Sequence, residues 1–343
     1  MKHLRKEVLF FLLIFLAGSS NNIFSQRKTL PKVEILNTGA NTSIRGLSVV
    51  NNNVVWVSGS NGMVGKSLNA GKDWKWITVK GFEQTDFRDI EALDERTAVI
   101  MGIASPAYIL RTVDGGDSWN IVYENKGKSM FLDAMEFWDD KNGMVIGDPL
   151  EGKFFLAHTN DGGRHWTEQA PYPFPLVDTG EACFASSGTN IRNGGAMGLI
   201  FVSGGKQSHL FMTGKKMAIP MLNGKETTGA NSVAVNEHGT IITVGGDFTD
   251  KEADSKNCFI TRNKGKDWTG PTEPPHGYRS CVEWLSGKQW ISCGLNGVDY
   301  TGDDGDTWKW ISKESFHVCR KARKGKAVFL AGSNGRIGKL TGL

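Results

Sequence analysis

The sequence is poor in several features that mark common classes of protein. It holds only 10 prolines and 5 cysteines among 343 residues, and it contains no run of like charges. These absences argue against a disordered chain, a coiled coil or a collagen-like polymer. There is no strand–Gly-x-Gly-x-x-Gly–helix unit, P-loop, Gly-x-Ser-x-Gly elbow or Cys-x-x-Cys-His motif, and no Cys/His spacing matches a zinc site. We therefore predict neither a cofactor nor a metal.

The net charge is also small. It is +4 at pH 7, of which Lys2, Arg5, Lys6 and Glu7 together contribute +2, so that the rest of the chain carries about +2. Binding to nucleic acid depends on Lys and Arg clustered on one face. We therefore do not expect a nucleic-acid partner.

Residues 1–25 are the one segment with a long apolar run. A basic start is followed by the apolar run Val8–Leu16 and then by small and polar residues, which is the pattern of a secretory signal peptide. The apolar run is too short for a spanning helix of about 20 residues. We predict cleavage after Ser19 or Ser25, no membrane span afterwards, and a periplasmic or secreted protein whose residues 26–343 form a single domain.

Glycine and aromatic residues are abundant, with 43 Gly, 11 Trp and 18 Phe, which indicates many tight turns between aromatic-rich strands. Five segments share the pattern Ser/Thr-x-Asp/Asn-x-Gly-x-x-Trp or a close variant. They are SLNAGKDW (67–74), TVDGGDSW (112–119), TNDGGRHW (159–166), TRNKGKDW (261–268) and TGDDGDTW (301–308). Successive copies start 45, 47, 102 and 40 residues apart, so the interval of 102 residues leaves room for one more unit. Leu210–Lys215 fits there as a degenerate copy.

A second series supports the same architecture. Seven apolar runs close on glycine, and another short strand-like stretch precedes each of them, including Gly180–Ala185 in the fourth unit. Four short strands in about 45 residues are typical of one blade of a β-propeller. The seventh unit lacks a fourth strand, whereas residues 32–37 form a spare one. We predict an all-β, seven-bladed propeller in which residues 32–37 complete the last blade and close the ring.

The repeated motif resembles the Asp-box (BNR) repeat of sialidases and of the photosystem II stability/assembly factor-like proteins. Segments such as FRDIEALDERTAVIMGIASPAYILRTVDGGDSW and GYRSCVEW are similar to an exported bacterial branch of the second group, and the resemblance covers nearly all of residues 32–343. It implies the propeller fold and a binding or assembly role. In the motif itself we expect the acidic or amide side chain to accept turn N–H bonds, Gly to supply a positive φ, and Trp to fill the gap between blades.

Polar residues at the starts of the innermost strands, and in the loops after the second strands, should gather at one mouth of the central channel. We predict that they bind a protein or glycan partner. The candidates are Arg45, Arg88, Asp89, Asp133, Asp148, Glu181, Asp247, Tyr278, Arg279 and His317.

Two other interpretations remain open. The charges could simply pair with one another around the channel. Alternatively, the chain could be a glycoside hydrolase of sialidase type, with Arg45, Arg88 and Arg279 holding a carboxylate, Tyr278 and Glu181 as the nucleophile pair, and Asp89 or Asp133 as the general acid. Sialidases have six blades, however, and Arg88 is followed by Asp-Ile rather than Ile-Pro. We favour a non-catalytic binding module that acts as a monomer.

The five cysteines are an odd number for an exported protein, so at least one should be free or pair between chains. Cys281 and Cys293 lie symmetrically about Gly287, which predicts that they face each other on adjacent strands. The pair could form a disulfide or remain as buried thiols.

Overall fold

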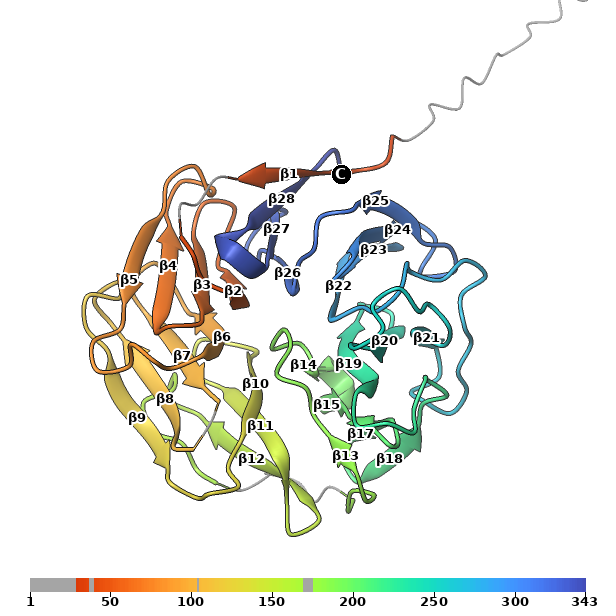
Figure 1. Cartoon of the computed structure of the whole chain (residues 1–343), viewed down its shortest axis with the longest axis horizontal. Helices are drawn as coiled ribbons and strands as arrows, with labels where there is room; N and C mark the ends of the chain where they lie inside the picture. Colours follow the sequence, from red (N-terminus) through yellow and green to blue (C-terminus); the bar gives the residue numbers. More distant parts are fainter. Residues whose placement is uncertain (1–28, 37–39, 104, 169–174) are drawn as a thin grey trace, which may run out of the picture.

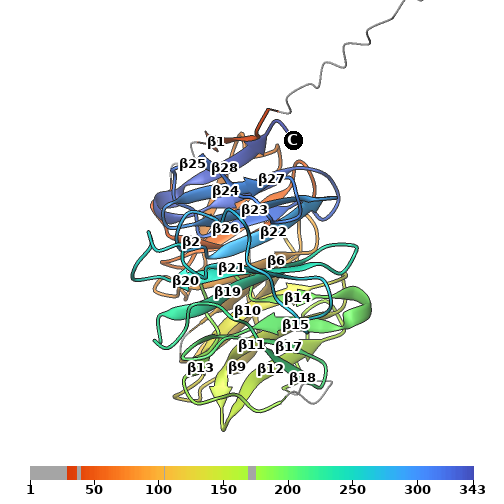
Figure 2. The same ribbon diagram turned by 90° about the vertical axis from the view of Figure 1, so that its right-hand side faces the viewer.

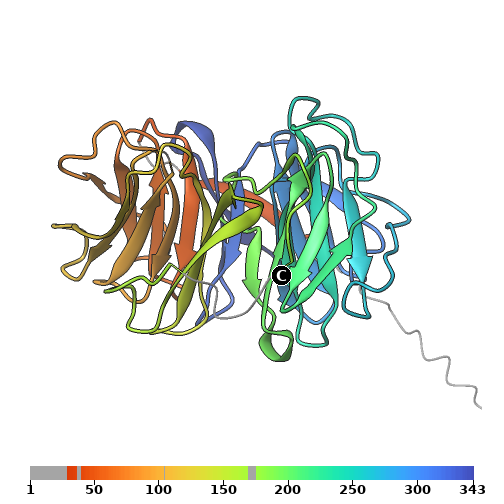
Figure 3. The same ribbon diagram turned by 90° about the horizontal axis from the view of Figure 1, so that it is seen from below.

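The computed structural model describes residues 29–36, 40–103, 105–168 and 175–343. Seven antiparallel sheets surround a central channel (Figure 1), and the views from the edge show strands running roughly along the ring axis (Figures 2 and 3). The predicted seven-bladed β-propeller is confirmed. The predicted signal peptide, residues 1–25, lies outside the described residues.

The first blade contains β2 (Ile44–Val49), β3 (Val55–Gly59), β4 (Met63–Ser67) and β5 (Lys75–Thr78). The second contains β6 (Phe87–Ala92), β7 (Ala98–Gly102), β8 (Ala107–Thr112) and β9 (Asn120–Asn125). The third contains β10 (Leu132–Phe137), β11 (Gly143–Leu150) and β12 (Lys153–Thr159). In the third blade a bridge between His158 and Thr167 stands in place of a full fourth strand.

Blade four contains β14 (Ile191–Asn193), β15 (Leu199–Val202), β17 (His209–Met212) and β18 (Lys215–Ala218). Blade five contains β19 (Thr228–Val235), β20 (Ile241–Asp247) and β21 (Cys258–Thr261), and its sheet is extended by the two-residue strands β13 (Glu181–Ala182) and β16 (Gly204–Gly205). Blade six contains β22 (Cys281–Ser286), β23 (Gln289–Gly294), β24 (Gly297–Thr301) and β25 (Lys309–Ser312). Blade seven contains β26 (Val318–Lys321), β27 (Val328–Ala331), β28 (Ile337–Thr341) and β1 (Lys32–Leu36). Two short 3-10 turns, η1 (Gly195–Met197) and η2 (Ser333–Gly335), precede β15 and β28.

Burial decreases from the channel outward within a blade. Strand β7 is buried along its whole length, whereas β9 at the rim is mostly exposed or half-buried. The inner strands are apolar on both faces because each blade is covered by a neighbour on either side. Blades one and two, for example, share a core that includes Trp56 and Ile90.

The N-terminal strand closes the ring. β1 pairs antiparallel with β28 from Lys32 opposite Thr341 to Leu36 opposite Ile337, and the two lie side by side in Figures 1 and 2. The sheet order β1-β28-β27-β26 makes β1 the outermost strand of the last blade, as the sequence predicts. Closure removes the exposed edge that an incomplete blade would leave.

The fourth blade corrects one prediction. Its innermost strand is β14 (Ile191–Asn193), not Gly180–Ala185, of which only Glu181 and Ala182 form a strand, β13, that pairs with β16. The prediction failed because the alternating pattern of 180–185 resembles an inner strand, whereas β14 has only three residues. The predicted hairpin at Leu210–Lys215 is confirmed as the β17–β18 turn.

The repeated turns have the predicted structural role. In the copy that begins at Thr112, the Gly116 N–H donates to Thr112 Oγ1 at 3.0 Å and the Ser118 N–H donates to Asp114 Oδ1 at 3.0 Å, while Gly116 has φ 90°. Trp119 packs edge-on against Trp56 of the neighbouring blade, with ring centroids 6.5 Å apart. The motif therefore maintains the blade-to-blade contact.

Candidate functional site

Four β-bulges lie near one mouth of the channel. The register between the first and second strands of a blade shifts at Arg45, Arg88, Asp133 and Asn231. A bulge inserts one extra residue and redirects its side chain. The same local irregularity therefore recurs in four blades near one end of the channel.

A cavity of about 420 Å³ opens there. It is lined by polar groups from the bulges and the loops after the second strands, together with aromatic side chains. The lining residues are Arg45, Arg88, Phe131, Asp148, Ala182, Cys183, Phe184, Ala185, Ser186, Asn231, Phe248, Tyr278, Ser280, Leu295 and His317. Arg45, Arg88, Asp148, Tyr278 and His317 are thus placed where the sequence predicts. We call this space the mouth cavity.

Positive charge at the mouth cavity is only partly neutralised. Arg88 pairs with Asp86 at 2.8 Å, whereas Arg45 donates only to the Ser186 carbonyl, at 3.3 Å, and forms no ion pair within the described part of the chain. Burial and the nearby Arg88 charge lower the pKa of Arg45. A guanidinium held beside another without its own carboxylate can attract an acidic group from outside.

Asp148 lines the cavity, whereas Asp133, which the sequence also places there, lies buried beside Asp148 and is not part of the lining. Asp133 is fully buried, and burial together with the neighbouring Asp148 raises its pKa well above the usual range. Burial also raises the pKa of Asp148, whose Oδ1 accepts the Cys183 N–H at 3.3 Å. A carboxyl with a raised pKa is more readily protonated, so it offsets the arginines less.

Tyr278 and His317 are held by the fold. The Tyr278 hydroxyl donates to Asn231 Oδ1 at 2.8 Å, and burial raises its pKa. His317 Nδ1 contacts the Ile44 carbonyl at 2.9 Å, and burial with the nearby Arg45 lowers the pKa of His317 to about 4. The imidazole is therefore neutral at pH 7 and adds no positive charge to the cavity.

Arg279 does not join the other two arginines. It is fully buried and makes a two-pronged ion pair with Asp299, in which Nε lies 2.7 Å from Oδ2. The expected three-arginine clamp is therefore wrong. The sequence could not show this, because Asp299 is 20 residues away on β24 and faces Arg279 only once the blade has formed.

Asp89, Asp247 and Glu181 also do not line the mouth cavity. Asp89 is buried and accepts the N–H groups of Ile90 and Met135. Asp247 is likewise buried and is held by Lys225 and by Thr249. These contacts hold loops and strand ends in place, and neither residue is part of the cavity lining.

Glu181 belongs to a separate polar cluster beside blade four. Its carboxylate contacts His209 Nδ1 at 2.8 Å and Lys216 Nζ at 2.9 Å, and Ser203 Oγ donates to it as well. Burial opposes ionisation, but these hydrogen bonds outweigh it and lower the pKa of Glu181 to about 2. The side chains of Asp178, Glu181 and His209 are close enough together to hold a metal ion. The Lys216 ammonium, however, already forms ion pairs with both carboxylates.

The proposed sialidase-type constellation is therefore not assembled. Tyr278 bonds to Asn231 while Glu181 bonds to His209 and Lys216, so the two do not form a nucleophile pair. Arg279 is bound to Asp299. The residues expected to act together lie in three separate hydrogen-bond networks.

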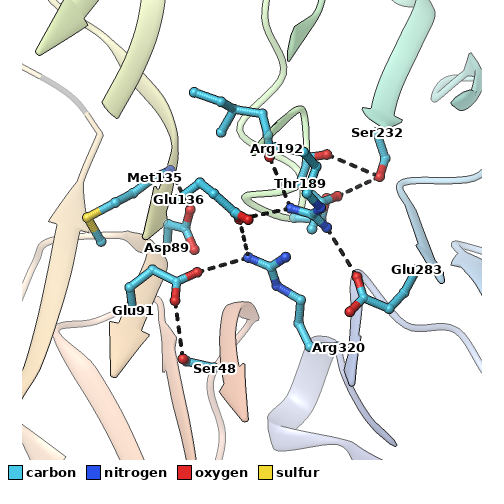
Figure 4. A network of polar contacts seen from close by, with 12 residues as sticks. Ser48, Asp89, Glu91, Met135, Glu136, Thr189, Arg192, Ser232, Glu283 and Arg320 are labelled. Atoms are coloured by element: carbon cyan, nitrogen blue, oxygen red, sulfur yellow. Dashed lines mark hydrogen bonds and ion pairs between the residues drawn. The ribbon is translucent and has the colours of Figure 1, made fainter. Parts of the chain in front are cut away.

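The opposite end of the channel holds a network that the sequence analysis missed (Figure 4). Arg320 lies 2.9 Å from Glu91 and 3.3 Å from Glu136, and Arg192 bridges Glu136 and Glu283 at 3.3 Å each. These five side chains, which we call the channel network, border a cavity of about 280 Å³. Burial raises the pKa of Glu91 to about 7, although Arg320 opposes the shift.

A sequence signal for this network existed. Four of the five residues occupy the same position in their blades, opposite the residue that lies three places before the glycine at the end of the second strand. They are Glu91, Glu136, Glu283 and Arg320. A polar residue recurring at that register, within buried strands, indicates side chains that face the channel together.

These features define the class of the protein as a seven-bladed propeller. Ion pairs join the inner strands of different blades at one end of its channel, and the mouth cavity lies at the other end. No family profile and no curated protein matches the chain.

Solved propellers nevertheless match it in structure. YCF48 bound to D1 peptide aligns with a TM-score of 0.64 and 14% identity over 90% of this chain and 94% of that one. YCF48 from Cyanidioschyzon merolae gives 0.61 and 12% identity over 90% and 98%, and the WD40 propeller domain of Doa1 gives 0.58 and 14% over 91% and 97%. At these identities the likeness establishes the fold.

Proposed function

We propose that this protein is an exported binding or assembly module, acting as a monomer without chemistry of its own, that receives a segment of a partner protein in the mouth cavity. The observation that carries the proposal is the cavity itself, with about 420 Å³ of space and two arginines of which Arg45 has no carboxylate partner among the described residues. A site of this size, apolar with a few converging polar groups, suits one or two side chains of a bound segment.

The charge of the mouth cavity favours an acidic group on the partner. Arg88 is paired with Asp86, but Arg45 has no carboxylate partner among the described residues, His317 is neutral, and burial raises the pKa of the lining residue Asp148. A carboxylate can accept two hydrogen bonds from a guanidinium, which adds orientation as well as affinity.

Two likenesses support a protein partner over a glycan. One solved propeller of the same architecture is described as bound to a peptide. The sequence resemblance to the photosystem II stability/assembly factor-like proteins points to assembly as well. The glycan-directed hydrolase rests on the sialidase resemblance alone, and hydrolysis of a fluorogenic sialoside that disappears in Tyr278→Phe would revive it.

Export is part of the proposal and rests on the signal-peptide pattern of residues 1–25, which predicts a periplasmic or secreted protein. Among the residues that the structure describes, no helix has the length and apolar character needed to cross a membrane.

The test compares partner recovery from an envelope extract by three forms of the purified protein. Arg45→Met/Arg88→Met removes the charges of the mouth cavity and keeps most of the side-chain volume. Lys80→Met/Lys128→Met removes two charges from exposed positions outside the cavity lining. We expect at least about tenfold lower recovery with the arginine variant, equivalent to 1.4 kcal/mol, and unchanged recovery with the lysine variant. Equal recovery by all three forms would exclude the mouth cavity as the binding site.

A further inference from the structure

Three of the five cysteines converge in the core between blades six and seven. Cys281 lies on β22, Cys293 is its direct cross-strand partner on β23, and Cys319 lies on β26 of the next blade. The three sulfur atoms are all within 4.8 Å of one another, and the Cys281 and Cys319 sulfurs are 3.6 Å apart. The thiols remain free, so the register predicted for Cys281 and Cys293 is confirmed while the disulfide is not formed.

The spacing matches a three-sulfur metal site. An ion about 2.3 Å from each of three thiolates holds the sulfurs about 4 Å apart. The Cys281 and Cys319 sulfurs, 3.6 Å apart, are close to that value, and no pair of the three is more than 4.8 Å apart, so an ion could enter with small side-chain shifts. A disulfide would instead require one pair of sulfurs to approach to about 2.05 Å and would leave the third thiol unused.

Groups on the next blade make polar contacts with Cys281. Its sulfur accepts the Cys319 N–H at 3.4 Å, and the Cys319 thiol also points toward it. The thiolate is the form that binds metals.

The ligand set selects the ion. Within the described residues the group contains three sulfurs and no His, Asp or Glu, and none of the three cysteines has exposed surface through which water could supply a fourth ligand. Zn²⁺ in structural sites takes four ligands, whereas a soft monovalent ion accepts fewer and prefers sulfur.

We propose that Cys281, Cys293 and Cys319 form a Cu(I) site that joins blade six to blade seven. Each thiol that becomes a ligand releases its proton as the Cu–S bond forms, and the oxidation state of copper does not change. Because the site exists only in the folded ring, binding stabilises the native state. The proposal is independent of partner binding at the mouth cavity.

The experiment loads copper during folding, because the closed core is inaccessible. Full-length protein is unfolded and refolded with a thiol reductant and excess Cu(I), then dialysed against a weak Cu(I) chelator, and its copper content and melting temperature are measured. We expect one copper per chain and a higher melting temperature than in protein refolded without copper. Cys319→Ser should retain no copper, whereas the matched controls Cys183→Ser and Cys258→Ser, which alter the other two buried cysteines, should retain it.

X-ray absorption of the wild-type protein gives a readout that does not depend on the variants. Three sulfur neighbours at about 2.3 Å support the site. Absence of stoichiometric copper in the wild-type protein would overturn the proposal, as would equal copper retention in Cys319→Ser. A count of only three alkylatable thiols in protein purified and unfolded without reductant would also overturn it, because it would show a disulfide in place of the metal site.

Discussion

The two ends of the central channel are built from the same inner strands but use charge differently. At the channel network, Arg192 and Arg320 share three glutamates, so every charged side chain has an ionic partner. At the mouth cavity, Arg88 uses Asp86 while Arg45 has only a carbonyl among the described residues. Charges that satisfy one another stabilise the ring, whereas charges left without partners are available to a ligand.

The difference arises from strand geometry. Residues near the ends of β6, β10, β22 and β26 lie in regular register and reach across the channel to each other. At the starts of β2, β6 and β19 the bulges interrupt the register, and their side chains Arg45, Arg88 and Asn231 line the mouth cavity. Bulges are common next to binding sites for this reason.

The largest effect is expected for Arg320→Met. The substitution leaves Glu91 without its 2.9 Å partner and weakens the neutralisation of Glu136, both of which are buried or nearly so. Breaking a buried ion pair from one side costs about 3–5 kcal/mol. Urea unfolding at pH 7 should show a loss of this size, and a loss below about 1 kcal/mol would mean that the channel network does not hold the ring together.

A smaller effect is expected from pH acting on the mouth cavity. His317 has a pKa of about 4 in the folded protein and about 6.5 when unfolded, so its contribution to stability is present above pH 6.5 and is lost as the pH falls toward 4. The loss should reach about 3 kcal/mol. His317→Gln should lower this pH dependence of the unfolding free energy between pH 6.5 and 4, whereas His238→Gln, at an exposed position, should leave it as in wild type. Identical pH profiles for all three proteins would contradict the buried, neutral state of His317.

The smallest effect on stability is expected for Arg45→Met. This side chain has one 3.3 Å hydrogen bond and lies beside another positive charge, so its removal should change the free energy of unfolding by less than about 1 kcal/mol. Urea unfolding measured beside Arg320→Met provides the comparison. A loss as large as that of Arg320→Met would show that Arg45 is structural and would remove the distinction between the two ends.

The sequence predicts the ring well because its signals are local and repeated. Apolar runs that close on glycine recur seven times, and the motif with Trp at its eighth place recurs five times. The spare strand at residues 32–36 fills the one vacant strand position. The register of Cys281 opposite Cys293 follows from a short hairpin, whose turn length determines the pairing.

The candidate site is less predictable because it depends on contacts between blades and on which way a side chain points. Arg45 and Arg279 both lie near the start of an inner strand, yet Arg45 faces the channel whereas Arg279 points into its own blade toward Asp299. The prediction for Glu181 was wrong because the innermost strand of the fourth blade is the short β14 and not the segment that contains Glu181. The channel network joins residues as far apart as Glu91 and Arg320, which are adjacent only after the ring has closed.

The most direct test of the account places a photo-crosslinking amino acid at each end of the channel in living cells. Phe248 lines the mouth cavity and is 39% exposed, and Trp284 lines the cavity at the channel network. We expect a crosslink to a partner protein from position 248 and no crosslink from position 284. The crosslink from position 248 should disappear when Arg45 and Arg88 are both changed to Met. A crosslink from position 284 alone, or one from position 248 that persists without the two arginines, would contradict the account.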